Sequence, residues 1–124
     1  MILGIGTDIL KVQRIRAIYG NADDPFFKST YTRKEQEEGS ERHEPALYFA
    51  TRFAGKEAVF KSLGTDGMGV TLKEIEILGS EVGQPRVALL GAVKALAKRK
   101  GIKNVLISLS YDDDYVIAFV IATD

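Results

Sequence analysis

The segment His43–Leu63 constrains the fold most, because it has the strongest helical pattern in the chain. Pro45 suits the first turn of a helix, and Gly64 suits the position just after its end. Residues at helical spacing form one mainly apolar stripe along it: Ala46, Ala50, Phe53, Glu57 and Phe60. We therefore predict a long helix over this segment.

Shorter elements are predicted on both sides of the long helix. Strands are expected over Ile2–Leu10, Leu72–Leu78, Arg86–Leu90, Val105–Ser110 and Tyr115–Ala122. Helices are expected over Lys11–Tyr19, after Thr32 with Glu35 completing a capping box, and over Ala92–Lys100. The last two strands are joined by Asp112–Asp114 as a hairpin. Strands separated by helices and ending in a hairpin indicate an α+β domain.

Composition limits the classes of protein and site. With 124 residues, 45% hydrophobic and 27% charged, the chain is expected to form one compact globular domain over residues 1–124. The formal net charge is zero, so nucleic acid and anionic membranes are not expected partners. There are no cysteines, which excludes disulfides and thiolate sites. The apolar start carries Asp8 and no basic region, unlike a signal peptide, and no run is long enough to span a membrane. We expect a cytoplasmic protein.

Glu57 is a carboxylate in the middle of the apolar stripe. Burying an unpaired charge is costly, so Glu57 needs a cation, a hydrogen-bonding partner or a metal. Lys61 lies one turn further on, at i+4. A structural Glu57–Lys61 ion pair is therefore an alternative to a functional site.

Asp8 is the second unusual carboxylate, because it interrupts an apolar strand two positions after Gly6. Glycine in a strand often marks a close approach of a ligand or of another backbone. Alternatively, Asp8 closes the strand and caps the helix that begins near Lys11. Taken together, Asp8 and Glu57 are suited to a hard divalent ion such as Mg²⁺, with water and phosphate oxygens as the other ligands.

Three cations, Arg52, Lys56 and Lys61, lie on the same long helix and are candidates for binding phosphate. Helical geometry places Lys61 on the Glu57 side and the other two on a neighbouring stripe, so some of them are expected to be solvated. The glycines near the start do not form a dinucleotide-binding loop, because Ile9 stands where that motif has its third glycine.

Several motifs occur in order along the chain: GIGTDI at 4–9, YTRKE at 31–35, ATRFAGKEAVFKSLGT at 50–65, IEI at 75–77, GQP at 83–85 and SLS at 108–110. In these motifs the chain resembles the holo-[acyl-carrier-protein] synthases, the small trimeric class of 4′-phosphopantetheinyl transferases. The resemblance runs over essentially the whole chain. It implies an antiparallel sheet packed with a long central helix.

The resemblance also implies a role for each matching residue. Asp8 and Glu57 are implied magnesium ligands, and Glu57 is also the implied base for the carrier serine. Lys61 is implied to contact the coenzyme A pyrophosphate and assist catalysis. The other implied coenzyme A contacts are Arg52, Gly64, Thr65, Gly83, Gln84, Pro85 and Ser110. Arg14 and Arg16 are the implied docking residues for an acidic acyl carrier protein.

The implied reaction is a Mg²⁺-dependent transfer of 4′-phosphopantetheine from coenzyme A to a serine of apo acyl carrier protein. Adenosine 3′,5′-bisphosphate leaves, and the product supports fatty acid biosynthesis. The family works as a homotrimer with each site between two subunits, so coenzyme A, the carrier protein and further copies of the chain are the implied partners.

The sequence departs from the family at the nucleotide end of the site. Tyr111 follows Ser110 where the family usually has a histidine, and the three aspartates Asp112–Asp114 come next. The family often has basic residues just before the long helix, whereas here the acidic Glu44 follows Arg42 and His43. Two alternatives therefore stand beside the transferase: a non-catalytic domain that binds coenzyme A, and a small interaction protein with a Glu57–Lys61 ion pair.

Overall fold

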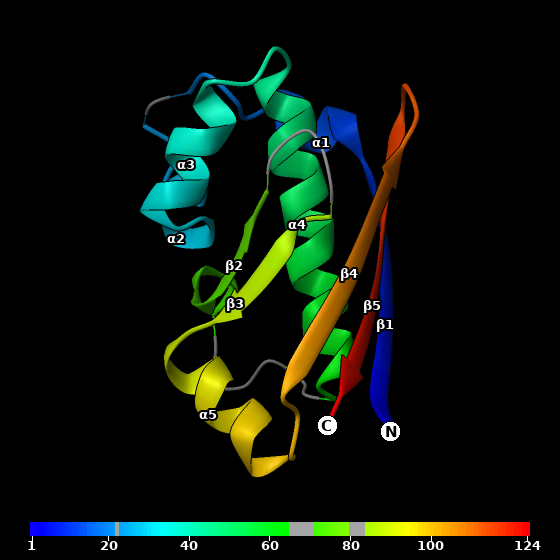
Figure 1. Cartoon of the computed structure of the whole chain (residues 1–124). Helices are drawn as coiled ribbons and strands as arrows, with labels where there is room; N and C mark the ends of the chain where they lie inside the picture. Colours follow the sequence, from blue (N-terminus) through cyan, green and yellow to red (C-terminus); the bar gives the residue numbers. More distant parts are fainter. Residues whose placement is uncertain (22, 65–70, 80–83) are drawn as a thin grey trace.

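The computed structural model describes all residues except 22, 65–70 and 80–83. In chain order the elements are β1 (Ile2–Lys11), α1 (Val12–Arg16), α2 (Phe26–Thr30), α3 (Arg33–Ser40), α4 (Pro45–Ser62), the 3-10 helix η1 (Leu72–Glu74), β2 (Ile75–Leu78), β3 (Arg86–Leu89), α5 (Gly91–Arg99), β4 (Asn104–Tyr111) and β5 (Tyr115–Thr123) (Figure 1). The α+β prediction is confirmed.

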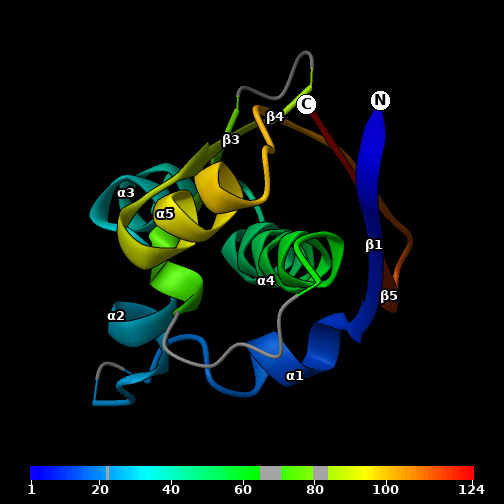
Figure 2. The ribbon, with the colours of Figure 1, turned by 90° about the horizontal axis from the view of Figure 1, so that it is seen from below.

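The strands form two antiparallel sheets. One has the order β1-β5-β4 and contains the predicted hairpin of β4 and β5; the other pairs β2 with β3. Helix α4 runs between the two sheets, with β1 and β5 on one side and β2 and β3 on the other (Figure 2). The central position predicted for the long helix is therefore confirmed, and α4 can present side chains towards both sheets.

Two glycines allow α4 to lie directly against β1. A Cβ atom at Gly6 would lie 1.9 Å from the Ala58 carbonyl oxygen, and one at Gly4 would lie 1.9 Å from the Ser62 carbonyl oxygen. Both contacts are with helix backbone, which cannot move aside as a side chain does. The glycines of the first strand thus bring together the strand carrying Asp8 and the helix carrying Glu57.

The outer face of the three-stranded sheet is apolar and uncovered in the single chain. Large hydrophobic side chains are exposed there on all three strands: Ile5, Ile9, Leu106, Ile117 and Phe119. The opposite face, with Val116, Ala118, Val120 and Ala122 of β5, is fully buried. In the described part of the chain, none of the helices has the length and apolar character that crossing a bilayer requires.

Some local predictions were wrong. The helix expected over Lys11–Tyr19 covers only Val12–Arg16 and continues as turns. The strand expected over Leu72–Leu78 begins as the 3-10 helix η1, whose capping box joins Thr71 and Glu74. Helix α2 was not predicted at all, because its five residues are too few to show a helical period.

Candidate active site

Asp8 and Lys61 meet at the contact between β1 and α4. Asp8 is paired in register with Ala118 in the middle of β1, and its side chain is 17% exposed. Lys61 Nζ donates to Asp8 Oδ1 at 3.2 Å and to the Thr7 carbonyl oxygen at 2.9 Å. The alternative of a structural Glu57–Lys61 ion pair is thus replaced by a pair between Lys61 and Asp8.

Glu57 faces the same place from one helical turn earlier. Partial burial raises the pKa of its carboxyl group, and the negative charge of Asp8 raises that pKa further, while Lys61 lowers it. Two carboxylates therefore lie close enough to repel each other. Among the described residues, no group of three or more potential metal ligands occurs. A hard cation held by Asp8 and Glu57 would need water and substrate oxygens to complete its coordination, which is how proteins usually hold Mg²⁺.

The alternative role of Asp8 as a helix cap is wrong. Lys11 occupies the N-cap position of α1, and that cap has no side-chain hydrogen bond. Asp8 is instead a strand residue directed towards α4. It meets the ammonium group of Lys61 where β1 packs on α4. The geometry therefore supports Asp8 as a site residue, in addition to its unusual place in the sequence.

Lys56 does not belong to the phosphate-binding candidates. Its side chain is fully buried, as is that of Glu35, and Lys56 Nζ donates to Glu35 Oε1 at 2.7 Å. Nζ also donates to the carbonyl oxygens of Leu72 and Ile75. Burial lowers the pKa of Lys56, and Glu35 counteracts this. The expectation of a solvated or phosphate-binding lysine is wrong, because Lys56 ties α4 to α3 and β2.

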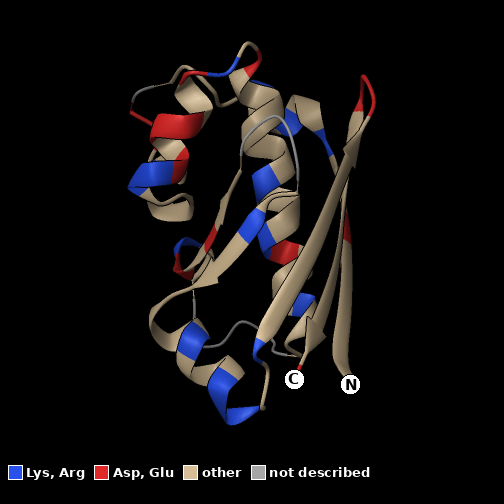
Figure 3. Ribbon diagram, in the orientation of Figure 1, with Lys and Arg blue, Asp and Glu red and all other residues tan. Residues whose placement is uncertain are grey.

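A cavity of about 890 Å³ lies near the start of α4. We call it the cationic cavity after the three arginines in its lining, although four acidic side chains line it as well. Its basic lining residues are Arg16, Arg42, His43 and Arg52, and its acidic ones are Glu44 and Asp112–Asp114. Asp112 Oδ1 accepts hydrogen bonds from the backbone N–H groups of Asp114 and Tyr115, so this carboxylate closes its own hairpin turn. The tip of the hairpin is the acidic end of β4 and β5 (Figure 3).

Arg52 reaches this cavity although most of its side chain is buried. Its Nε donates to the Ile77 carbonyl oxygen at 3.2 Å, and its Nη1 donates to Thr51 Oγ1 at 3.3 Å. Burial lowers the pKa of the guanidinium, although arginine keeps its charge in proteins. A held guanidinium at the wall of a cavity is suited to an anion such as phosphate.

The sequence profile of the 4′-phosphopantetheinyl transferase superfamily matches residues 4–120 of the chain. The chain belongs to this superfamily. It is 41% identical over 122 residues to the holo-[acyl-carrier-protein] synthase of Desulforudis audaxviator. The aligned region covers 98% of this chain and 93% of that protein.

Solved structures of holo-[acyl-carrier-protein] synthases have the same fold as this chain. The crystal structure of holo-[acyl-carrier-protein] synthase from Neisseria meningitidis has a TM-score of 0.89 and 35% identity, with 100% of both chains covered. The Helicobacter pylori enzyme, solved in complex with coenzyme A, has a TM-score of 0.80 and 25% identity, with 96% of this chain and 99% of that chain covered. The predicted family and enzyme class are confirmed.

The other predicted site residues of this transferase are scattered in the single chain. Pro85 lines the cationic cavity, Gln84 is exposed, and Gly64 ends α4 with a φ of 65°. Thr65 and Gly83 lie outside the described residues. Ser110 is exposed and pairs in register with Ile117 of the outer face, so it is not brought to Arg52 within one chain.

The predicted docking residues of the transferase lie on α1. Arg14 and Arg16 are both exposed. Arg16 also lines the cationic cavity and is 4.0 Å from Glu44. The basic surface of α1 is therefore close to the cationic cavity.

Sequence reasoning about the transferase missed two residues beside Arg52. Glu38 lies one turn after Glu35 on α3, and Tyr48 lies one turn before Arg52 on α4. Tyr48 Oη donates to Glu38 Oε2 at 2.5 Å, and the Arg52 guanidinium lies 4.1 Å from the centre of the Tyr48 ring. The signal available was the spacing of Tyr48 and Arg52 at i,i+4.

Proposed function

We propose that the protein transfers 4′-phosphopantetheine from coenzyme A to a serine of apo acyl carrier protein, with Mg²⁺ held by Asp8 and Glu57. The observation that carries the proposal is the meeting of Asp8, Glu57 and Lys61 where β1 packs on α4. That arrangement holds two acids and one ammonium on rigid elements, as phosphoryl transfer needs.

In the proposed reaction the serine Oγ forms a bond to the β-phosphorus of coenzyme A. The bond from that phosphorus to the bridging oxygen breaks, and adenosine 3′,5′-bisphosphate leaves. Glu57 accepts the serine proton, directly or through a water molecule. Bound magnesium would neutralise charge on the pyrophosphate.

Lys61 has the contacts that a pyrophosphate-binding lysine needs. Its side chain is 55% exposed and is held at its tip by Asp8 and the Thr7 carbonyl oxygen. An ammonium group held next to the metal ligands can contact the bridging oxygen as negative charge develops there. Lys61 is therefore proposed to stabilise the leaving group.

The nucleotide end of coenzyme A is assigned to the cationic cavity. Arg42 and Arg52 are proposed to bind its phosphate, with Pro85 and the neighbouring Gly83 and Gln84 beside the nucleotide. Asp8, Glu57 and Lys61 are not among the residues that line this cavity in the described part of the chain. One chain therefore offers the two ends of the proposed site in different places.

This separation supports a site made by two copies of the chain. The exposed apolar face of β1, β5 and β4 is suited to burial against another copy, and Ser110 and Gly64 would then contribute to composite sites. We propose a homotrimer in which each site takes Asp8 and Glu57 from one subunit and the cationic cavity from the next.

The exposed arginines Arg14 and Arg16 are proposed to dock the acidic carrier protein. This assignment places the carrier serine at the end of the site where β1 continues into α1. We propose that the product enters fatty acid biosynthesis and that the reaction takes place in the cytoplasm.

The deciding experiment is the mass of an apo acyl carrier protein after incubation with this protein, coenzyme A and Mg²⁺. We expect the carrier to gain the mass of one phosphopantetheine group, and the gain to disappear with a chelator or when the carrier serine is changed to alanine. Binding of coenzyme A without any gain in carrier mass would contradict the proposal and favour a non-catalytic domain.

A further inference from the structure

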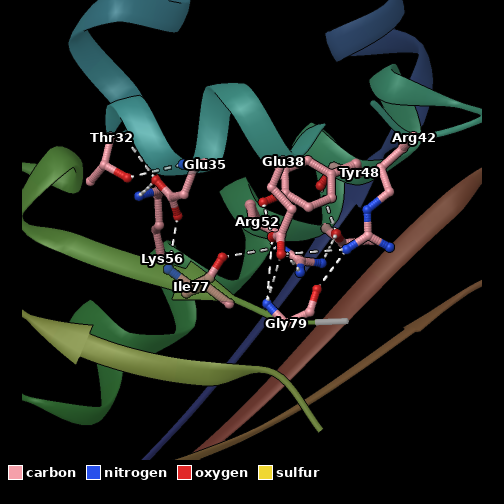
Figure 4. Close-up of polar contacts among 10 residues, drawn as sticks. Thr32, Glu35, Glu38, Arg42, Tyr48, Arg52, Lys56, Ile77 and Gly79 are labelled. Carbon is pink, nitrogen blue, oxygen red and sulfur yellow. Dashed lines mark hydrogen bonds and ion pairs between the residues drawn. The ribbon is translucent and has the colours of Figure 1, made fainter. Parts of the chain in front are cut away.

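A carboxylate, Glu38, lies at the centre of the polar contacts behind the cationic cavity (Figure 4). It accepts a hydrogen bond from Tyr48 Oη at 2.5 Å and lies 3.7 Å from Arg42 Nη2 and 3.6 Å from Arg52 Nη2. Its oxygens also accept from the Gly79 N–H, at 3.2 and 3.4 Å. One acid from α3 thus contacts two of the three guanidinium groups that line the cavity, those of Arg42 and Arg52.

Tyr48 completes this cluster from α4. The guanidinium carbon of Arg52 lies 4.1 Å from the centre of the Tyr48 ring, and that of Arg42 lies 5.2 Å from it. Burial and the hydrogen bond to Glu38 raise the pKa of the Tyr48 hydroxyl, so it stays a hydrogen-bond donor at neutral pH. The ring and the carboxylate together restrict where both guanidinium groups lie.

The backbone at the end of β2 and at Gly79, which directly follows it, also holds these two arginines. Arg42 Nη2 donates to the Gly79 carbonyl oxygen at 2.6 Å, and Arg52 Nε donates to the Ile77 carbonyl oxygen at 3.2 Å. A guanidinium has five N–H donors, more than Arg52 uses in its contacts with the described residues, so Arg52 keeps donors for a ligand in the cavity. Arginine side chains held in this way lose little conformational entropy when they bind a phosphate.

We infer that Glu38, together with Tyr48, is a positioning residue that holds Arg42 and Arg52 for the 3′-phosphate of coenzyme A. Through the two arginines it determines the preference for coenzyme A over 3′-dephospho-coenzyme A. This inference rests on the proposed function, because it assigns the cavity to the nucleotide end of that substrate.

Two simpler roles for Glu38 predict different results. If Glu38 acted only by its charge across space, its removal would make the cavity more positive and would strengthen phosphate binding. If Glu38 only joined α3 to β2, its removal would lower stability and would affect both substrates equally. A positioning role predicts weaker binding of the 3′-phosphate, with no loss of stability and no effect on a substrate that lacks this phosphate.

The test compares Glu38→Gln and Tyr48→Phe with the wild type, using coenzyme A and 3′-dephospho-coenzyme A as alternative substrates. Glu38→Gln should raise KM for coenzyme A about tenfold, with kcat almost unchanged. This is the effect of losing one charge-assisted hydrogen bond between an arginine and the 3′-phosphate. KM for 3′-dephospho-coenzyme A should not change. Tyr48→Phe keeps the ring and should raise KM for coenzyme A about threefold.

The matched control is Glu37→Gln on the same helix. Among the described residues the Glu37 side chain forms an exposed pair with Arg33, and this variant should leave both KM values as in the wild type. Calorimetric binding of adenosine 3′,5′-bisphosphate and of adenosine 5′-monophosphate repeats the comparison without a carrier protein. The inference is overturned if the wild type has no preference for the 3′-phosphate, or if Glu38→Gln leaves the preference unchanged or increases it. A wild type that binds with the expected preference but transfers nothing would refute the proposed function and not the positioning role.

Discussion

Lys61 Nζ lies 3.2 Å from Asp8 Oδ1, so the proposed leaving-group lysine contacts one of the two proposed magnesium ligands directly. The same ammonium group donates to the Thr7 carbonyl oxygen, which fixes it beside β1. A metal ion and this lysine therefore compete for the charge of Asp8. At the same time, a pyrophosphate bound between them would meet both cations.

The competition predicts opposite effects of Lys61→Ala on two measured quantities. We expect kcat to fall about 100-fold, because a stabilising donor at the leaving group is lost. The Mg²⁺ concentration for half-maximal activity should fall about threefold, because an exposed ion pair of this kind contributes little more than that. Both are read from Mg²⁺ titrations of the residual transfer, with Lys28→Ala on α2 as an exposed control. Weaker Mg²⁺ binding by Lys61→Ala would contradict the competition.

Glu57→Gln is predicted to separate stability from activity. The folded protein raises the pKa of Glu57, so the ionised side chain destabilises the fold at neutral pH and a neutral glutamine relieves this. We expect Tm without metal to be unchanged or slightly raised, and turnover to fall about 1,000-fold. Thermal unfolding and the carrier mass measurement check the two halves, with Glu41→Gln as control. Transfer at the wild-type rate would refute the role of Glu57.

Gly6→Ala should disrupt the contact that builds the site. The new Cβ would lie 1.9 Å from the Ala58 carbonyl oxygen, so β1 and α4 must move apart. We expect two results. The free energy of unfolding should fall by about 2 kcal/mol or more, and any remaining activity should depend less on the Mg²⁺ concentration. Urea unfolding measures the first, and Lys28→Ala, at an exposed position of α2, is the control. A variant as stable as the wild type would show that this close approach is not required.

Local patterns predicted most of the helices and strands and singled out Asp8 and Glu57, whereas the antiparallel sheet packed with a central helix was implied by the family resemblance. The apolar stripe of α4 placed Glu57, and the alternation in β1 placed Asp8 on the same side as Gly6. What the sequence could not predict depends on contacts between distant segments. Lys56 looked like a surface cation, but Glu35 lies 21 positions earlier and is brought to it only by the packing of α3 on α4.

The exposed outer sheet face makes a prediction about assembly. Phe119→Asp places a charge among the apolar side chains of β1, β5 and β4, at a position that is 43% exposed in the single chain. We expect the variant to remain folded, to become monomeric in sedimentation equilibrium, and to lose transfer although Asp8, Glu57 and Lys61 are unchanged. A monomeric variant with full activity would show that one chain holds a complete site.

The buried pair of Lys56 and Glu35 should behave as a single unit in a double-mutant cycle. Lys56→Met leaves the Glu35 carboxylate buried without its cation, so we expect a loss of about 3–5 kcal/mol in the free energy of unfolding. Glu35→Gln leaves the Lys56 ammonium group buried without its carboxylate, and we expect a similar loss in the free energy of unfolding. The double variant should lose much less than the sum, because no unpaired charge remains. Urea unfolding of the four proteins measures the coupling, and additive losses would mean that the two residues stabilise α3 and α4 independently.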